Sequence, residues 1–345
     1  MNRSQARGLE APPPRESVAL FGHADAERTV LAAYRSGRMP HAWLIGGPQG
    51  VGKATLAYRV ARFVLAHPDS STEEVQAAQT LALESAHPVA RRVAAQAHPD
   101  VLTLERTPGP SGAVRSVITV DEVRRTVGFF GSTAGAGGWR ICIVDSADDL
   151  QSPQGANALL KVLEEPPSRA LFLLVSHAPG RLLATIRSRC RRLTLRPLGA
   201  ADVAQAAAQA LARDAADPEV LKAAGAAQGS VARATILLGG AALAVRDRMI
   251  ELLGSLPQID LQALHTLGDT LGRSDDTVFS TFVETIQDWL SDQLRVRDAQ
   301  ASRLAPLAEV WEKLDRAVRD VEVFNLDRKP MVFAVFGLLA EAARH

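Results

Sequence analysis

The chain has 345 residues, of which 47% are hydrophobic and 22% are charged, and its net charge is +1 at pH 7. At roughly 100–200 residues per domain, this length predicts two or three globular domains. A near-neutral charge does not indicate a nucleic-acid binder, so any contact with phosphate must come from a local patch. The two cysteines, Cys142 and Cys190, are too few for a disulfide framework or a cysteine-rich zinc site.

The N-terminal segment, residues 1–17, is polar and contains three consecutive prolines, Pro12 to Pro14. We expect it to form a flexible tail, since it lacks the apolar stretch of a signal peptide. The longest apolar runs, such as Ala170 to Val175, are too short to cross a bilayer. Together with the low cysteine content, this predicts a cytoplasmic protein.

Short apolar runs alternate with helical patterns through the first two hundred residues. The runs are residues 41–45, 140–145, 170–176 and 193–195, and the helical patterns are residues 53–66 and 157–165. Apolar runs without polar alternation are typical of strands that are buried on both faces. We therefore predict an α/β domain over residues 18–197, in which a parallel sheet carries helices on both faces.

The pattern changes after Pro197, where only helical periodicity remains. Residues 198–242 are rich in alanine and predict a small helical domain. Residues 243–345 predict a second, all-helical domain. One of its apolar stripes contains Phe282, Ile286 and Leu290, which follow helical spacing.

A glycine-rich segment follows the first apolar run. Gly47-Pro-Gln-Gly50-Val-Gly52-Lys53 matches the G-x-x-x-x-G-K pattern of a phosphate-binding loop, and it opens a predicted helix, as that pattern requires. Glycines allow backbone N–H groups to face phosphate oxygens, and the helix N-terminus adds positive potential. Lys53 would reach the outer phosphates of a nucleotide.

Two positions depart from a working nucleotide site. The residue after Lys53 is Ala54, where an active loop has a Ser or Thr hydroxyl that holds Mg²⁺. Thr55 follows one residue later, about 100° further around the helix, so it cannot simply replace that hydroxyl. Asp145 ends the second apolar run, but the next residue is Ser146, which has no carboxylate to accept a proton from water.

These departures predict a degenerate nucleotide site. Its candidate residues are Gly47, Gly50, Gly52, Lys53, Thr55 and Asp145. We expect no metal site and impaired Mg²⁺ coordination, and two outcomes stay open for the nucleotide: an empty site, or weak binding of ATP or ADP. Asp148 and Asp149 follow Ser146, and we interpret them as N-cap and first-turn residues of the next helix.

Two further segments carry a family resemblance. They are Asn157-Ala-Leu-Leu-Lys-Val-Leu-Glu-Glu-Pro-Pro167 and Arg181-Leu-Leu-Ala-Thr-Ile-Arg-Ser-Arg-Cys190. Both resemble segments of the gamma/tau and delta-prime proteins, which are the AAA+ clamp-loader subunits of bacterial DNA polymerase III. The resemblance covers residues 18–200 firmly and the rest loosely. It implies an AAA+ domain, a small helical lid over residues 198–242, and a C-terminal helical collar over residues 243–345 that joins subunits in a ring.

The resemblance implies a role for Arg189. In this family the Ser-Arg-Cys segment carries an arginine finger that reaches the ATP of the neighbouring subunit. A guanidinium is planar and always charged, so it can stabilise the charge that develops on the γ-phosphate. The alternative is that Arg189 caps a strand end or pairs with a carboxylate.

Departures from the family pattern indicate which branch the chain resembles. The sensor-2 arginine of gamma/tau subunits falls at Ala232, and the four-cysteine zinc module has no counterpart in residues 66–99, which contain no cysteine. Three ATP-handling positions are therefore changed while the finger segment remains. This combination is similar to the delta-prime branch, which donates a finger and does not hydrolyse ATP, so no zinc and no ATPase or polymerase activity of its own are expected.

The partners implied by the resemblance are the gamma/tau and delta subunits in a hetero-pentameric clamp loader, the sliding clamp, and primer-template DNA through the assembled complex. Three alternatives stay open: an active AAA+ ATPase such as a gamma/tau-like motor subunit, a nucleotide-responsive adaptor outside replication, and, with least support, a small-molecule kinase. Six arginines lie in residues 181–196 without Asp or Glu. They would suit DNA phosphates or a solvated strand edge.

Overall fold

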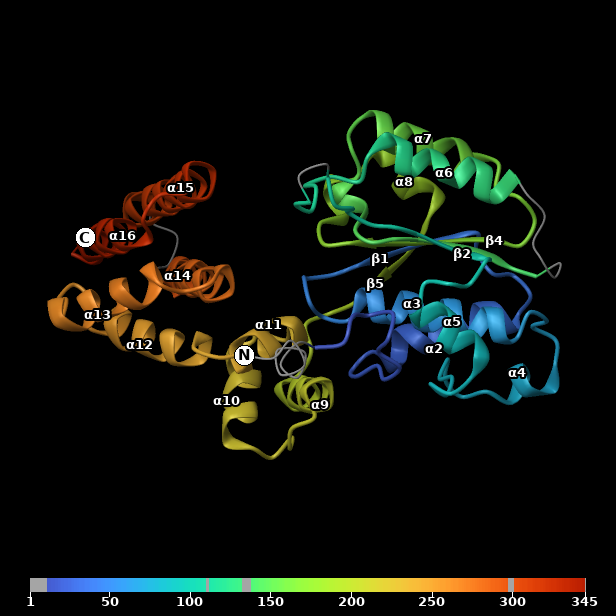
Figure 1. Ribbon diagram of the computed structural model, residues 1–345, viewed down its shortest axis with the longest axis horizontal. Helices are drawn as coiled ribbons and strands as arrows, with labels where there is room; N and C mark the ends of the chain where they lie inside the picture. Colours follow the sequence, from blue (N-terminus) through green and yellow to red (C-terminus); the bar gives the residue numbers. More distant parts are fainter. Residues whose placement is uncertain (1–10, 110–111, 132–137, 297–300, 345) are drawn as a thin grey trace. The chain divides into compact units, whose positions relative to one another are not determined.

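The computed structural model describes residues 11–109, 112–131, 138–296 and 301–344. The chain forms two compact units, Met1–Thr235 and Ile236–His345. The first unit contains the sheet with its covering helices and three further helices, and the described part of the second unit consists of helices (Figure 1).

A five-stranded parallel sheet forms the centre of the first unit. In spatial order the strands are β2 (Val101–Leu104), β3 (Arg140–Val144), β4 (Ala170–Ser176), β1 (Ala42–Gly46) and β5 (Arg191–Thr194). Every residue of β1 and β4 is buried, as expected for central strands that are covered on both faces. β5 lies at one edge of the sheet, and Arg191, Arg192 and Thr194 on it are exposed.

Helices cover both faces of this sheet (Figure 1). On one face lie α2 (Ala24–Arg35), α3 (Lys53–Ala66), α4 (Glu73–Ala77) and α5 (Pro88–Ala94), and on the other α6 (Val120–Gly131), α7 (Gln154–Glu164) and α8 (Ala184–Arg189). A separate buried apolar cluster fills each of the two interfaces, with Trp43, Leu56 and Leu173 in the first and Leu44 and Phe172 in the second. The predicted α/β class with helices on both faces is confirmed.

Two short 3₁₀ turns extend strands toward the site. They are η1 (Ala147–Asp149), which follows β3, and η2 (Pro179–Arg181), which follows β4. Both lie at the carboxyl ends of parallel strands, where ligands of open α/β sheets bind.

The small helical domain predicted over residues 198–242 contains α9 (Ala200–Leu211), α10 (Pro218–Ala226) and α11 (Val231–Leu238). α10 begins with Pro218, and its N-cap Asp217 accepts a hydrogen bond from the Glu219 amide at 2.9 Å. The three helices belong to the first unit as far as Thr235, so the division between the units falls inside α11.

The second unit contains five helices in its described residues. They are α12 (Ala242–Gly254), α13 (Leu261–Gly272), α14 (Asp276–Val296), α15 (Ala301–Phe324) and α16 (Arg328–Ala343). α12 packs against α14, and α16 packs against both α13 and α15. Phe282, Ile286 and Leu290 of the predicted stripe are fully buried. No helix in the described residues is long and apolar enough to span a membrane.

Candidate functional site

The glycine-rich segment forms a loop between β1 and α3. Gly50 and Gly52 have φ angles of +75° and +103°, which other residue types rarely adopt. A Cβ atom on Gly47 would lie 2.4 Å from the carbonyl oxygen of Leu195. Glycine is therefore required at these positions for the backbone path, whether or not a phosphate binds.

Lys53 is the first residue of α3 and is buried. Its Nζ atom donates a hydrogen bond to the carbonyl oxygen of Pro48 in the same loop. Burial lowers the pKa of Lys53 to about 8, and the nearby carboxylates of Asp148 and Asp145 oppose this shift. The lysine is thus placed for a phosphate but is bonded to its own loop.

The residue after Lys53 is Ala54, which has no hydroxyl group. Ala54 packs against the apolar cluster on the α3 face of the sheet. Thr55 lines the same cavity as Lys53, one helical step further along. A working loop would have a hydroxyl at position 54, and in this chain that position carries a methyl group.

The end of β3 carries the other half of the site. Asp145 lines the cavity, and its pKa is raised by burial and by the neighbouring carboxylate of Glu105, against the attraction of Lys53. Ser146 is buried, and its hydroxyl donates to Asp148 Oδ2 at 2.9 Å. An active enzyme has its water-activating carboxylate at this position. In this chain the position holds a hydroxyl that is hydrogen-bonded to Asp148.

Asp148 does not have the role that its sequence position indicated. The N-cap of η1 is Ser146, whose Oγ accepts from the Asp148 amide at 3.2 Å. The Asp148 carboxylate instead accepts a hydrogen bond from Ser176 Oγ, at the end of β4, at 2.9 Å. Asp148 and Asp149 do lie in the first turn of η1, as expected, but the interpretation of Asp148 as a cap was wrong, because Ser146 is the N-cap and the Asp148 side chain crosses to the next strand.

A cavity of about 440 Å³ lies above the loop. Gly50, Gly52, Lys53, Thr55 and Asp145 line it, as do residues from α9 and α11 of the small helical domain. Among the predicted nucleotide-site residues, Gly47 is not part of the lining. The cavity therefore brings together most of the site that the sequence predicted.

The small helical domain contacts the loop directly. The amide of Val231, the first residue of α11, donates to the carbonyl oxygen of Gly50 at 2.9 Å. A Cβ atom on Gly50 would lie 2.1 Å from Ser230 Oγ and 2.8 Å from the Cβ atom of Ala232. Ala232, at which the family resemblance places the sensor-2 arginine, therefore brings a methyl group close to the loop.

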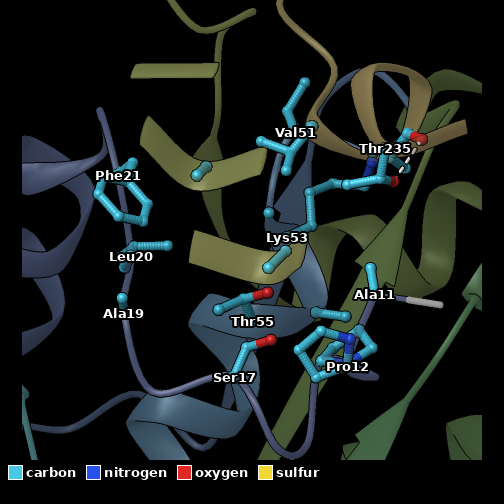
Figure 2. A pocket seen from close by; sticks show the side chains of 18 of the residues that line it. Ala11, Pro12, Ser17, Ala19, Leu20, Phe21, Val51, Lys53, Thr55 and Thr235 are labelled. Atoms are coloured by element: carbon cyan, nitrogen blue, oxygen red, sulfur yellow. Dashed lines mark hydrogen bonds between the residues drawn. The ribbon is translucent and has the colours of Figure 1, made fainter. Parts of the chain in front are cut away.

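The N-terminal segment also lines the cavity. Figure 2 shows Pro12, Ser17, Leu20 and Phe21 around the space that Lys53 and Thr55 share. Two buried arginines of α3 hold its backbone: Arg62 donates to the carbonyl oxygens of Arg15 at 2.9 Å and Ser17 at 2.6 Å, and Arg59 donates to that of Val18. Part of the segment predicted as a tail is thus tied to α3, and residues 1–10 lie outside the described residues.

One residue that sequence reasoning missed supports the loop from below. His23 is buried, and its Nε2 atom lies 2.7 Å from the carbonyl oxygen of Val51. Burial lowers the pKa of His23, against a smaller opposite effect of this hydrogen bond. A single histidine ahead of a helix carries no sequence signal for such a contact.

Arg189 lies apart from this cavity, at the end of α8. Its side chain is 34% exposed, and its Nη2 atom lies 2.7 Å from Oε1 of Glu164 at the end of α7. Nη1 donates to the carbonyl oxygen of Thr185 at 3.0 Å. The guanidinium is accessible at the surface, and it is not among the residues that line the cavity of its own chain.

The other arginines of this stretch point several ways. Arg181, Arg192 and Arg196 are exposed, and Arg191 stacks over Trp43 with its guanidinium carbon 5.1 Å from the ring centroid. Arg187 donates to the carbonyl oxygen of Gly180 at 2.5 Å. In the described residues no group of three His, Cys, Asp or Glu side chains could hold a metal ion.

A family profile described as DNA polymerase III, delta subunit, matches residues 22–199, which contain the loop, the cavity's carboxylates and Arg189. The chain belongs to this DNA polymerase III delta subunit family. The predicted resemblance to clamp-loader subunits of bacterial DNA polymerase III is confirmed.

Individual relatives agree with this family. The chain is 40% identical over 153 residues to the DNA polymerase III subunit delta' of Pseudomonas aeruginosa (44% of this chain, 41% of the relative). It is 34% identical over 168 residues to that of Escherichia coli (49% and 46%), and 27% identical over 305 residues to subunit tau/gamma of Haemophilus influenzae (87% and 39%). The matched region is less than half of each relative's own length.

Among solved structures, a DNA polymerase III gamma subunit-related protein of Thermotoga maritima overlays with a TM-score of 0.40 at 17% identity, covering 91% of this chain and 100% of that chain. The delta subunit family assignment rests on the sequence comparisons and on the sheet, loop and strand-end residues described above.

Proposed function

We propose that this chain is the delta-prime-type subunit of a bacterial clamp loader, which does not hydrolyse ATP itself and donates Arg189 to the ATP site of a neighbouring gamma/tau subunit. The observation that carries the proposal is the placement of Arg189. The guanidinium is accessible at the end of α8, outside the cavity of its own chain. A side chain that served its own nucleotide would have to line that cavity.

The state of the chain's own site supports the first half of the proposal. An ATPase needs an oxygen ligand for Mg²⁺ after the loop lysine and a carboxylate that orients the attacking water. Ala54 and Ser146 stand at these positions, and the Ser146 hydroxyl is bonded to Asp148. We infer that the isolated chain turns over ATP at a negligible rate.

The cavity still has features that suit a nucleotide. Its volume of about 440 Å³, the loop backbone and Lys53 would accommodate and attract phosphates. Asp145 and Thr55 would be the side chains nearest to a metal ion, but Ala54 leaves the coordination incomplete. We propose weak binding of ATP or ADP that does not depend on Mg²⁺, and no resident cofactor.

An arginine finger must leave its partner within the chain when it binds a neighbour's ATP, and the ion pair of Arg189 with Glu164 is weak enough to allow this. Both side chains are partly exposed, at 34% and 47%, and such a pair contributes at most about 1 kcal/mol. A triphosphate carries several negative charges and accepts bidentate hydrogen bonds from a guanidinium. The finger can therefore leave Glu164 for a neighbour's ATP at little cost.

The names of the relatives indicate the assembly. Delta' and gamma/tau proteins are subunits of DNA polymerase III, and we propose that this chain joins gamma/tau and delta subunits in a hetero-pentameric ring through the helices of its second unit. The ring would open a sliding clamp and place it on primer-template DNA in the cytoplasm. The polymerase activity would belong to the holoenzyme and not to this chain.

The replacement Arg189→Ala tests the proposal in the assembled complex. We expect DNA-stimulated hydrolysis at the neighbouring site to fall by about two orders of magnitude or more, because a finger stabilises charge only in the transition state. Phosphate release gives the rate, and gel filtration shows that assembly is intact. Arg189→Lys keeps the charge but loses the planar fork, so it should restore little activity. Full activity in Arg189→Ala would refute the finger.

A second candidate is an active ATPase, favoured by the retention of Lys53 and by Thr55 in the cavity lining. It predicts Mg²⁺-dependent phosphate release from the isolated chain at the rate of a gamma/tau subunit. The proposal predicts that this release stays at background. One assay on the purified chain separates the two.

A further inference from the structure

The carboxylate of Asp148 accepts hydrogen bonds from two neighbouring segments, at Ser146 and at residues 176–178. Oδ1 accepts from Ser176 Oγ at 2.9 Å and from the Ala178 amide at 3.0 Å. Oδ2 accepts from the His177 amide at 2.6 Å and from Ser146 Oγ at 2.9 Å. One side chain of η1 therefore holds the end of β4 and the first two residues after it.

These four hydrogen bonds stabilise the ionised form of the Asp148 carboxylate. Burial acts to raise the pKa of Asp148, but the donors from His177, Ala178, Ser146 and Ser176 outweigh burial, and the pKa lies below its usual value. Hydrogen bonds to an ionised acceptor are roughly twice as strong as neutral ones. The charged carboxylate is therefore the form that fixes the two amides.

The two amides stand at the start of the segment that leads to Arg189. Ala178 is followed by η2 and then by α8, whose last residue is Arg189. Arg187 of α8 donates back to the carbonyl oxygen of Gly180 in η2, which ties the helix to the turn. Ile186 anchors α8 in the apolar cluster. A continuous set of contacts thus links Asp148 to the finger helix.

In an AAA+ site that binds and hydrolyses ATP, the ends of β3 and β4 face the nucleotide. In this chain the polar groups at those two ends, Ser146 and Ser176, are bonded to Asp148. The carboxylate of Asp148 therefore joins the two strand ends to each other.

We propose that Asp148 is a positioning residue for Arg189: its carboxylate locks the segment from Ser176 to η2 so that α8 presents the guanidinium in one fixed place. The proposal rests on the proposed finger role of Arg189 for its effect on hydrolysis. The lock itself is a property of the single chain and is testable without partners.

The first experiment measures hydrogen exchange of the isolated full-length chain. Asp148→Asn keeps the shape but leaves only one acceptor oxygen, and its amide group faces donors. We expect exchange at His177 and Ala178 to speed up at least about tenfold, and exchange in residues 179–189 to speed up with it. Asp149→Asn is the matched control, since Asp149 pairs with Arg106 at 3.2 Å. Faster exchange at the two amides with α8 unchanged would refute the lock.

The second experiment measures DNA-stimulated hydrolysis in the assembled complex. Asp148→Asn should lower kcat about three- to tenfold and leave KM for ATP unchanged, because the neighbour binds the ATP. In the Arg189→Ala background the same replacement should have no further effect, since its influence passes through Arg189. Additive losses, or a kcat equal to that of Asp149→Asn, would overturn the proposal.

The two experiments fail independently. If Arg189→Ala alone leaves hydrolysis intact, the finger is wrong, while hydrogen exchange still reports on the lock. If Asp148→Asn does not fold, the pair Ser146→Ala and Ser176→Ala removes both hydroxyl donors and leaves the carboxylate. This pair should change exchange and kcat in the same direction by about twofold, and no change in either would count against the lock.

Discussion

The two functional regions of the first unit contrast in how their polar groups are used. In the cradle, formed by the loop Gly47–Lys53 and the ends of β3 and β4, the groups bond to one another: Lys53 to Pro48, and Ser146 and Ser176 to Asp148. At the end of α8, Arg189 stays accessible, and it contacts Glu164, through a partly exposed ion pair, and the carbonyl oxygen of Thr185 in its own helix. The polar groups of the first region are therefore used within the chain, whereas the guanidinium of Arg189 remains accessible from outside it.

The largest expected effect comes from forcing catalysis back into the cradle. Ser146→Glu removes a buried hydroxyl donor and adds a third carboxylate to those of Asp148 and Asp145. We expect the free energy of unfolding to fall by about 2–4 kcal/mol, as buried like charges repel and lose hydration. Urea unfolding measures the loss, which should shrink at acid pH. Ser146→Ala is the control and should cost about 1 kcal/mol. An unchanged midpoint would mean that the site still has room for catalysis.

The charge of Lys53 gives a second way to test the cradle. Its pKa of about 8 means that the free chain loses the ammonium above pH 8. A bound phosphate favours the charged form, so a proton must be taken up on binding above this pH. We expect ADP affinity to be flat below pH 8 and to fall toward about tenfold per pH unit above it. Fluorescence titration from pH 7 to 9.5 measures this, and Lys53→Met should remove the pH dependence.

The smallest effect is expected at the finger. Glu164→Gln breaks the exposed pair with Arg189 and should change the free energy of unfolding by no more than about 1 kcal/mol. Hydrolysis by the assembled complex should rise by up to about threefold, because Arg189 no longer leaves a charged partner. Glu165→Gln, at the exposed neighbouring position, is the control. A tenfold loss in Glu164→Gln would instead make Glu164 part of the finger's working geometry.

Buried elements could be predicted from the sequence because their patterns are strong. β4 is a continuous apolar run, and α3 follows its glycine loop, so both were predicted with the bounds that the structure has. The short strand β2 was missed, since Val101–Leu104 alternates and is only four residues long. α6 was missed as well. Its bounds, Val120–Gly131, include glycine and two adjacent phenylalanines, which weaken the helical pattern.

The site could be predicted where a motif fixes the backbone, and not where contacts join distant segments. The loop glycines, Lys53 and Asp145 follow known spacing. The Asp148 contacts depend on β3 and β4 being neighbours in the sheet, which brings residues 148 and 176–178 together. No local pattern contains that information, so the nearest local interpretation, a helix cap, took its place.

Arg59 and Arg62 hold the N-terminal segment through the carbonyl oxygens of Arg15, Ser17 and Val18. Every amino acid has a backbone carbonyl oxygen, so these hydrogen bonds do not depend on the side chains of the segment. Residues 15–18 can therefore vary in type and still follow the same path along α3. Replacing Arg59 or Arg62 would instead remove the hydrogen bonds that hold this segment, although the sequence of the segment itself is unchanged.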